Sequence, residues 1–478
     1  MINKRREFLI YGGASLFLLN FPVLGRSSPA IKTQGKRAVN LFQFLTDYQI
    51  NDVKSGAMTL DLTKVIQNAF IVSAEAGVKL IINKGSWRCD GPLVTRSNLH
   101  VDCEIGACLY PHKWSRTGAF IGNIDPDDFR SSYKNSIQKN IVIENMQIDG
   151  QFLPYGTLGN SNAIGFARGV YGILIKNCIV KNVKFNWLGG HGAGGKAVNY
   201  ESGVFNSSVI GLRAINCGIA LFVQGMAGWH INGEKKSTTA IELDDIYAEN
   251  CEAAFGAFGI NIDSDPDGDM RSMQVNVGSI DFVNCGHAPN RRANDPQKSG
   301  PIVFGEAQNV RIRSISGRNY AEYPNSYPMD GVSVGTGLSG PVGAAVWGWG
   351  QNITIDNFKF IGNCDSLVRI NRARALGDDA GPSGRPKSSH NFNVLNIKHT
   401  GATDYILSLD KNRARRIDPV DLSGNISATT DILNAGFCDA SLKGYNQIII
   451  NAVDSATGQS LVDSASNLLS QGNSYSRL

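Results

Sequence analysis

Apolar and polar residues alternate along most of the chain after residue 75. Segments such as 140–150, 172–182 and 352–360 place apolar side chains at every second position and then reach Asn or Gly. Alternation with a period of two predicts β-strands that bury one face, whereas a helical period of 3.6 is nearly absent from this part of the chain. The pattern therefore predicts an almost entirely β protein whose short strands are separated by Asn- or Gly-containing bends.

The strands belong to a repeat. Asn-Cys dipeptides end four similar strands, at Cys217, Cys251, Cys285 and Cys364, and the first three cysteines are separated by two successive spacings of 34 residues. Apolar positions recur two and four residues before each Asn, or three and five in the last copy. A fixed period of this length is typical of a solenoid, in which each coil stacks on the previous one.

Stacked coils give the repeated Asn and Cys residues a structural role. An Asn at a recurrent bend can adopt the left-handed conformation and hydrogen-bond to the Asn of the adjacent coil. The neighbouring Cys then fills the interior as a small apolar residue. We therefore predict a stacked ladder of free thiols, with disulfides and metal ligation as alternatives. No CxxC motif or matched His spacing supports zinc, and nine cysteines cannot all pair within one chain.

The start of the solenoid is predicted to carry a helix. Residues 60–77 have an amphipathic helix pattern with Val65, Ala69, Ile71 and Val72 on or near one face, and such a helix covers the open core of a first coil. The order of helix, strand, Gly-x-Trp turn, strand, Ser-Asn-Leu, strand and Gly-Ala-x-Leu resembles the opening of the pectin-lyase-like superfamily, which includes polygalacturonases, pectate lyases and phage tailspikes. The resemblance implies an all-β fold, a right-handed parallel β-helix with an N-terminal capping helix. A six-stranded barrel or sandwich is the alternative.

The N-terminus has the features of an export signal. Residues 1–30 contain a basic start, an apolar stretch from Phe8 to Leu24, and small residues near Ala30. Arg5 and Arg6 resemble a twin-arginine signal, whose cargo crosses the membrane folded. We predict export to the periplasm or the extracellular space, and the alternative is an apolar segment that anchors the protein. This leader on a β-helix resembles periplasmic β-helix proteins of exopolysaccharide biosynthesis, of the colanic acid type.

Four regions are predicted along the chain. They are a signal (residues 1–30), an N-terminal cap with the first coils (31–110), the parallel β-helix (111–415), and the last coils with a C-terminal cap (416–478).

Composition and charge limit the partners. Charged residues make up 18% of the chain and hydrophobic residues 42%, as in folded proteins. The formal charge of +5 falls to +2 without residues 1–30, because these contain Lys4, Arg5, Arg6, Arg26 and Glu7. The mature chain therefore gives no indication of nucleic-acid binding. No internal apolar run is long enough to span a bilayer, so stable membrane insertion of the mature chain is not expected.

A β-helix presents long faces that match an extended polymer, and the resemblance implies a polysaccharide partner. We predict a glycosidase or lyase that acts on a bacterial exopolysaccharide and requires no cofactor, although calcium is a candidate. The alternative is a non-catalytic polysaccharide-binding or assembly protein. Tailspikes of this superfamily trimerise, so a trimer is one alternative for the oligomeric state.

Glycoside hydrolysis needs two carboxyl groups, and acids one or two coils apart satisfy that separation. Residues 303–312 and 346–355 share a pattern of Val, aromatic, Gly and Gln-Asn at a spacing of 43, with a looser copy around Met226. Stacking of these copies would place Glu306 between Met226 and Trp349, as a proton donor beside an indole that receives a sugar ring. The alternative is a turn residue beside a Trp that packs a loop. The candidate sugar platforms are Trp229, Trp347 and Trp349.

An acidic loop offers further candidates. Asp263, Asp265, Asp267 and Asp269, with Gly268, match the start of a D-x-D-x-D-G calcium loop. The match fails at the twelfth position, which is Gln274, and the flanking segments read as strands, so an EF-hand is not expected. Three interpretations are kept: a calcium site completed from another coil, a catalytic or substrate-binding role for Asp263 or Asp265, and a solvated turn.

Two further residues are weaker candidates for substrate binding. Arg271 lies beside the acidic loop, as the base of a calcium-assisted lyase would. His191 lies in a glycine-rich segment that resembles a polygalacturonase fragment, although the motifs of that family occur in the wrong order and Asn-Thr-Asp is absent. We therefore carry over none of that family's catalytic residues.

Overall fold

The computed structural model describes parts of the chain between residues 38 and 475. The described residues are 38–112, 118–124, 137–153, 161–167, 169–183, 195–201, 203–226, 230–231, 234–235, 238–251, 253–260, 274–286, 300–319, 342–370, 389–401, 403–409, 417–426, 429–434, 447–454 and 474–475.

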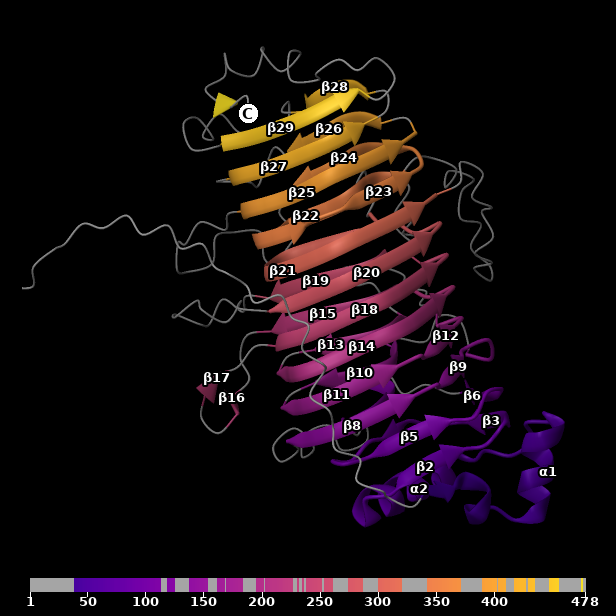
Figure 1. Cartoon of the computed structure of the whole chain (residues 1–478). Coiled ribbons are helices and arrows are strands. Elements are labelled where there is room, and N and C mark those ends of the chain that lie inside the picture. The colour runs from indigo at the N-terminus through magenta and orange to yellow at the C-terminus, as the bar shows by residue number, and fades with distance from the viewer. Residues whose placement is uncertain are drawn as a thin grey trace, which may run out of the picture. The chain divides into compact units, whose positions relative to one another are not determined.

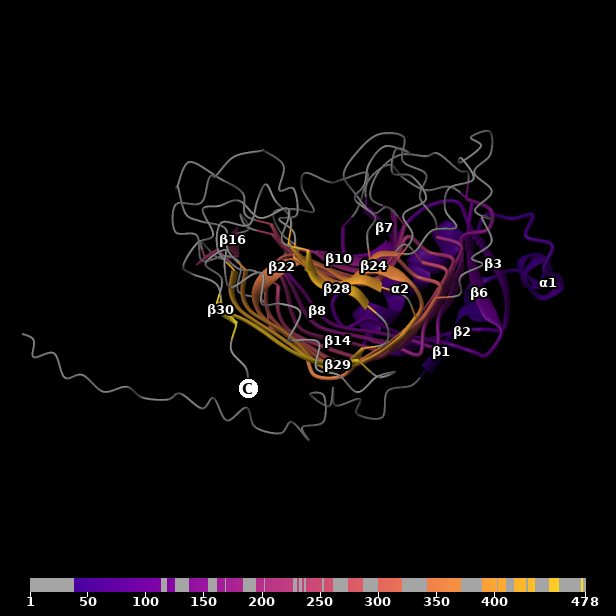
Figure 2. The same ribbon diagram turned by 90° about the horizontal axis from the view of Figure 1, so that it is seen from above.

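Parallel strands of the described residues stack coil upon coil in one continuous 28-stranded sheet, whose pairings define three faces that we call sheets A, B and C (Figure 1). Sheet A contains β4 (Leu93–Val94), β7 (Gly118–Gly122), β10 (Ser161–Ala167), β13 (Lys196–Glu201), β15 (Ile219–Met226), β19 (Ala253–Ile260), the first parts of β21 (Ile302–Arg318) and β22 (Val342–Ile355), β24 (Cys364–Ile370), β26 (Thr403–Leu409) and β28 (Thr429–Asn434). Viewed along the stack, β10, β22, β24 and β28 lie on one side and β8, β14 and β29 on the opposite side (Figure 2).

The other two sheets complete each coil. Sheet B contains β1 (Ala38–Asn40), β2 (Lys79–Ile82), β5 (His100–Cys103), β8 (Gln138–Glu144), β11 (Val170–Lys176), β27 (Ile417–Ile426), β29 (Gln447–Asp454), β30 (Ser474–Tyr475) and parts of β14 (Val204–Ile215), β18 (Thr239–Glu249), β20 (Val275–Val283), β21, β22 and β25 (Ser389–Thr400). Sheet C contains β3 (Gly85–Cys89), β6 (Ala107–Pro111), β9 (Gln147–Asp149), β12 (Ile179–Lys181), β23 (Phe358–Ile361) and the C-terminal parts of β14, β18, β20, β21 and β25. A separate antiparallel pair joins β16 (His230–Ile231) and β17 (Glu234–Lys235).

The molecule is therefore a right-handed parallel β-helix with helices at its N-terminal end, which confirms the predicted fold class. Those helices are η1 (Leu41–Phe44), α1 (Asp47–Ser55) and α2 (Thr63–Ala76). The predicted apolar face of α2 is wrong in detail, because Val72 is 40% exposed and Ala69 alone of the four named residues is buried. The buried stripe is Ile66, Ala69, Phe70, Ser73 and Ala74. None of the described helices is both long and apolar enough to cross a membrane.

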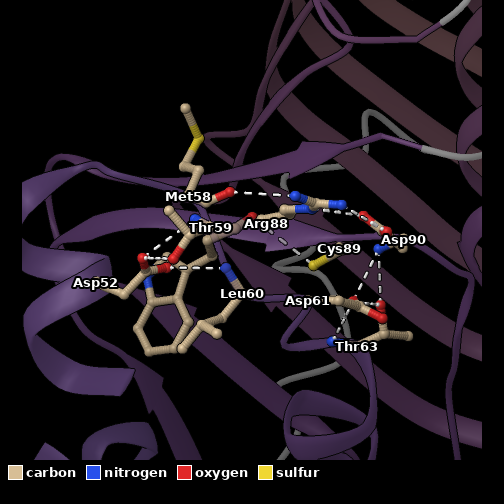
Figure 3. A network of polar contacts seen from close by, with 10 residues as sticks. Asp52, Met58, Thr59, Leu60, Asp61, Thr63, Arg88, Cys89 and Asp90 are labelled. Atoms are coloured by element: carbon tan, nitrogen blue, oxygen red, sulfur yellow. Dashed lines mark hydrogen bonds and ion pairs between the residues drawn. The ribbon is translucent and has the colours of Figure 1, made fainter. Parts of the chain in front are cut away.

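The connection between α1 and α2 is held by buried polar contacts (Figure 3). The Asp52 carboxylate accepts hydrogen bonds from the Thr59 backbone and hydroxyl groups and from the Leu60 N–H, at 2.5 to 3.3 Å. Burial alone would raise the pKa of Asp52, but these hydrogen bonds outweigh it and hold the pKa below its usual value.

A second set of contacts joins the same connection to sheet C. The guanidinium group of Arg88 forms a bidentate pair with Asp90, with both N–O distances 2.8 Å (Figure 3). The backbone N–H of Asp90 donates to Asp61 and to the Thr63 hydroxyl. These polar groups therefore find hydrogen-bond partners within the N-terminal cap and β3, and they connect the two.

Asparagine ladders mark the bends between the sheets. Asn250 donates to Asn216 at 3.3 Å, and Asn216 donates to Asn182 at 3.1 Å, with all three residues at φ between 53° and 57°. This confirms the predicted left-handed Asn ladder for the coils that are 34 residues apart. In the fourth copy the bend is occupied by Gly362, at φ 150°, instead of Asn363, which accounts for the shifted apolar spacing.

The cysteines line the interior. All eight described cysteines are free thiols, and Cys217, Cys251, Cys285 and Cys364 are buried, which confirms the predicted thiol ladder. The Cys217 and Cys251 thiols each donate to a backbone carbonyl of the preceding coil, at 3.6 Å. Burial raises the pKa of the Cys217 thiol well above 9.0.

Candidate functional site

The outer face of sheet A differs from an ordinary solvated sheet face. Alternate residues of its strands, such as Leu221, Phe255 and Phe304, point into the main core. Other residues of these strands form a second apolar cluster that consists of Ile219, Phe222, Ala253, Val303, Ala344 and Trp347, with Phe258 packed against it. Apolar side chains on both faces of one sheet indicate that the outer face has a role beyond solvation.

Strand register arranges this face into three rows that run across successive coils. The Lys196 row contains Asn162, Lys196, Ile219 and Ala253. The Phe222 row contains Gly165, Asn199, Phe222, Gly256, Val303, Trp347 and Arg369. The Phe258 row contains Ala167, Glu201, Gln224, Phe258, Gly305 and Trp349. Successive members are about 4.8 Å apart, the spacing of neighbouring strands.

Between β13 and β19, the first two rows are buried and the third is partly exposed. Lys196 is 5% exposed and Phe222 is 6% exposed, whereas Glu201, Gln224 and Phe258 are half-buried. The Phe258 row is therefore the part of this face that is most open to solvent between β13 and β19.

Lys196 carries a charge into this apolar surrounding. Its Nζ atom lies 4.3 Å from the centroid of the Phe222 ring, on the next strand. A cation over an aromatic face is attracted by the ring quadrupole, which offsets part of the cost of burial. Burial nevertheless lowers the pKa of Lys196 from 10.5 to about 8, and the negative charge of Glu201 opposes part of this shift. The amine is thus close to its titration point near neutral pH.

Two amides beside Lys196 have unused hydrogen-bonding capacity. Asn162, opposite Lys196 on β10, is 4% exposed, and Asn199, on β13, is 1% exposed. The Oδ1 atoms of both amides are buried and accept no hydrogen bond within the part of the chain that the structure describes. The Asn199 amide nitrogen donates to Glu201 at 3.4 Å. Buried polar atoms are normally satisfied, so these two oxygens retain an unused capacity to accept hydrogen bonds.

Glycines on the adjacent strands make room for the aromatic rings. A Cβ atom at Gly256 would lie 2.6 Å from Cδ2 of Phe222, and a Cβ atom at Gly305 would lie 2.4 Å from Cδ1 of Phe258. The two rings therefore lie along the sheet, over the glycines, with their centroids 5.0 Å apart. This arrangement gives a continuous ring surface that a bulkier residue at either glycine would disrupt.

Trp347 and Arg369 continue the Phe222 row on later coils. Trp347 is 6% exposed, and its Nε1–H is buried with no acceptor among the described residues. Arg369, which is opposite Trp347 on β24, has a buried Nε–H group that also has no acceptor among the described residues. The Phe222 row therefore has an unused acceptor at Asn199 and unused donors at Trp347 and Arg369.

The predicted stacking around Glu306 requires a correction. The spacing of 43 residues holds from Ala307, which is opposite Gly350, but Trp349 is opposite Gly305 because β21 has a bulge between Gly305 and Ala307. Glu306 is the extra residue at that bulge. Met226 is opposite Ile260, and the pairing of β19 with β21 ends at Phe258 and Gly305, so no described pairing places Met226 in the row of Glu306. The side chains of Glu306 and Trp349 lie outside the described residues.

Several other predicted site residues also lie outside the described residues. They are His191, Trp229, Asp263, Asp265, Asp267, Asp269 and Arg271. Within the described ranges, no three His, Cys, Asp or Glu side chains are grouped as metal ligands.

Sequence reasoning missed Lys196, Asn162, Asn199 and Phe222. In isolation, the alternation of "KAVNYE" puts Lys196 and Asn199 on opposite faces of a strand, so it does not predict that both lie on the outer face. Their burial depends on which strands are neighbours, and the aromatic residues that cover Lys196 come from a later coil. The nearest signal in the sequence was the set of Phe-Gly dipeptides at Phe255, Phe258 and Phe304.

Comparisons with known proteins support the fold. No protein-family model matches the chain, and no curated protein sequence matches it. The surface protein and adhesin PfbA of Streptococcus pneumoniae is similar in structure, with a TM-score of 0.53 and 12% identity, over 87% of this chain and 98% of that chain. This similarity supports the right-handed parallel β-helix fold that the sequence predicts.

Two further solved structures are similar at lower scores. The A-module of the Azotobacter vinelandii mannuronan C-5 epimerase AlgE6 has a TM-score of 0.45 and 10% identity, over 87% of this chain and 99% of that chain. ORF18 of Geobacillus virus E2 has a TM-score of 0.44 and 12% identity, over 81% of this chain and 61% of that chain. The chain thus spans less than two thirds of ORF18.

Proposed function

We propose that this protein is exported and acts on a bacterial polysaccharide, which it binds along the outer face of sheet A. The observation that carries the proposal is the half-buried Phe258 ring, which packs against Phe222 along the sheet, beside buried amides with unused hydrogen-bonding atoms. Aromatic faces receive sugar rings, and amides bond to sugar hydroxyls. Rows that repeat at about 4.8 Å along the coils also suit a repeating polymer.

The reaction we favour is cleavage of the polymer by a glycosidase or a lyase. Glu201, a half-buried carboxyl group on this face that accepts a hydrogen bond from Asn199, is a candidate acid or base. Asp263, Asp265 and Glu306 stay candidates for the additional acids of a hydrolase, and a calcium ion held by the 263–269 loop stays a candidate cofactor. Fold similarity does not select among these chemistries.

The proposal includes a place in the cell. Residues 1–30 resemble a twin-arginine leader, so we propose function in the periplasm or outside the cell, in an exopolysaccharide pathway. The second candidate function is non-catalytic binding or assembly of the same polymer, which the buried aromatic and amide row supports equally well.

The test is incubation of the purified mature protein with bacterial exopolysaccharides and pectins, with and without EDTA. Reducing ends without absorbance from unsaturated uronates would identify a hydrolase, and the absorbance would identify a lyase, with calcium implicated if EDTA abolishes it. Binding without product would favour the assembly role. Phe258→Ala should weaken binding at least about tenfold, as loss of an aromatic contact does. The matched control is Phe152→Ala, at an aromatic residue that is 41% exposed on another part of the chain. No binding to any polymer would refute the proposal.

A further inference from the structure

We infer that Lys196, Asn162 and Asn199 form a subsite for the carboxylate of an acidic sugar. The inference rests on the proposed function, because it assumes that the outer face of sheet A receives a polysaccharide. It adds the class of sugar, and it assigns specificity to a lysine outside the loops in which the sequence placed the chemistry.

The first argument is that Lys196 has no ion-pair partner among the described residues, unlike three other cations of this protein. Lys79 pairs with Asp102 at 2.5 Å, Arg88 pairs with Asp90 at 2.8 Å, and Arg311 pairs with Asp356 at 2.9 Å. Lys196 is more buried than any of these, yet it has no carboxylate within 4.0 Å among the described residues, and its close contact is the Phe222 ring. A buried charge without an ion pair is costly, so a site of this kind is expected where an anion binds from outside.

The second argument is the arrangement of the neighbouring groups. Asn162 is directly opposite Lys196, and Asn199 is directly opposite Phe222, over which the ammonium lies. The buried Oδ1 atoms of these amides are free among the described residues. A sugar carboxylate is flanked by ring hydroxyls, so the carboxylate can accept hydrogen bonds from the ammonium while the hydroxyls donate to the amide oxygens.

The third argument concerns the surrounding charge. On the same strand, Glu201 faces the subsite and bonds to Asn199. Of the described residues that pair with β13 around the subsite, Asn162 lies on β10, and Ile219, Phe222 and Gln224 lie on β15. None of them is charged. Glu201 already places one negative charge near this single ammonium, so an added anion is attracted by Lys196 and repelled by Glu201, and each further negative charge binds less favourably. The subsite therefore suits one carboxylate better than a densely charged group.

The experiment compares polymers that differ only in their carboxyl groups. Polygalacturonate, alginate and glucuronan are each tested against their carboxyl-reduced, neutral derivatives, with the wild type, Lys196→Met and Lys359→Met. Lys359 is an exposed lysine on β23 and is the matched control. We expect at least one acidic polymer to bind the wild type about tenfold or more tightly than its reduced form. Lys196→Met should remove that difference while binding to the reduced form persists, and Lys359→Met should change neither.

The outcomes separate this inference from the proposed function. Binding that is equally tight for acidic and reduced polymers, or a preference that survives in Lys196→Met, overturns the carboxylate subsite and leaves the polysaccharide-binding face intact. Absence of binding to every acidic and neutral polymer overturns both. Lys196→Arg provides a further readout, because arginine does not titrate in this range. Preference for the acidic polymer should weaken above about pH 8 in the wild type but persist in Lys196→Arg.

Discussion

The ammonium of Lys196, on β13, lies 4.3 Å from the centroid of the Phe222 ring, on β15, the next strand of sheet A. Both side chains are at least 94% buried, although they are on the outer face of the sheet. A cation–π contact contributes only about 0.5 to 2 kcal/mol, which is less than the cost of burying an ammonium group. The pair therefore lowers the stability of the fold, as functional sites often do.

The first prediction follows from that cost. Lys196→Met should increase the free energy of unfolding at pH 7 by on the order of 3 kcal/mol, because the pKa of Lys196 falls from 10.5 to about 8 on folding. The unfolded chain binds more protons than the folded chain between these two values. The penalty is therefore complete below about pH 8 and disappears as the pH rises towards 10.5. Unfolding midpoints at pH 7 and at pH 10.5 check this.

Lys359→Met provides the control, since Lys359 is exposed and should leave both midpoints nearly unchanged. Equal destabilisation by Lys196→Met at both pH values would contradict the electrostatic explanation. It would show instead that the aliphatic part of the lysine is required for packing.

The second prediction concerns the glycine beneath the Phe222 ring. Gly256→Ala would place a Cβ atom 2.6 Å from Phe222 Cδ2, so the ring has to shift from its position. We expect a loss of about 1 to 3 kcal/mol in stability, typical of overpacking, together with weaker polymer binding. The control is Gly91→Ala, whose added methyl would contact Thr63 at an ordinary 3.4 Å. Unchanged binding in Gly256→Ala would show that the position of the ring is not needed for the ligand.

Most of the fold could be predicted from short sequence patterns. Alternation identified the strands, and the spacing of Cys217, Cys251 and Cys285 identified the coil, because a repeat reports the same environment several times. The bends were predicted from Asn because few other residues tolerate the left-handed conformation. The buried face of α2 was not, since Val72 and Ile66 are both apolar and the choice between them depends on how the first coil packs against the helix.

The candidate site could not be predicted in the same way. The alignment around Glu306 failed at one residue, because a bulge changes the register without changing the apolar pattern. Lys196 and Asn199 were overlooked because a polar residue at an outward strand position is normally solvated. Their burial arises from side chains of neighbouring coils, and a single strand sequence carries no information on those neighbours.

The third prediction concerns the Asn ladder. Asn216 at φ 54° donates to Asn182 and accepts from Asn250, so Asn216→Ala loses both hydrogen bonds and strains the backbone. We expect a loss of about 2 to 4 kcal/mol of unfolding free energy. Asn216→Gly should lose about 1 kcal/mol less, because glycine tolerates this conformation.

Asn68→Ala, at an exposed position of α2, is the control and should be nearly neutral. Equal losses for Ala and Gly would assign the whole effect to the hydrogen bonds.

The fourth prediction concerns the thiol ladder. Seven of the eight described cysteines are buried, and burial raises the pKa of the partly exposed Cys108 to about 11. Because the thiolate is the reactive form, the native protein should react slowly with iodoacetamide at pH 7.5, and Cys108 should be labelled first among the eight. In denaturant all eight should be labelled rapidly, which peptide mass spectrometry can follow site by site.

Rapid native labelling of Cys217 or Cys251, or a disulfide between them, would contradict a closed interior. It would indicate that neighbouring coils separate, since these thiols are reachable only from inside the stack.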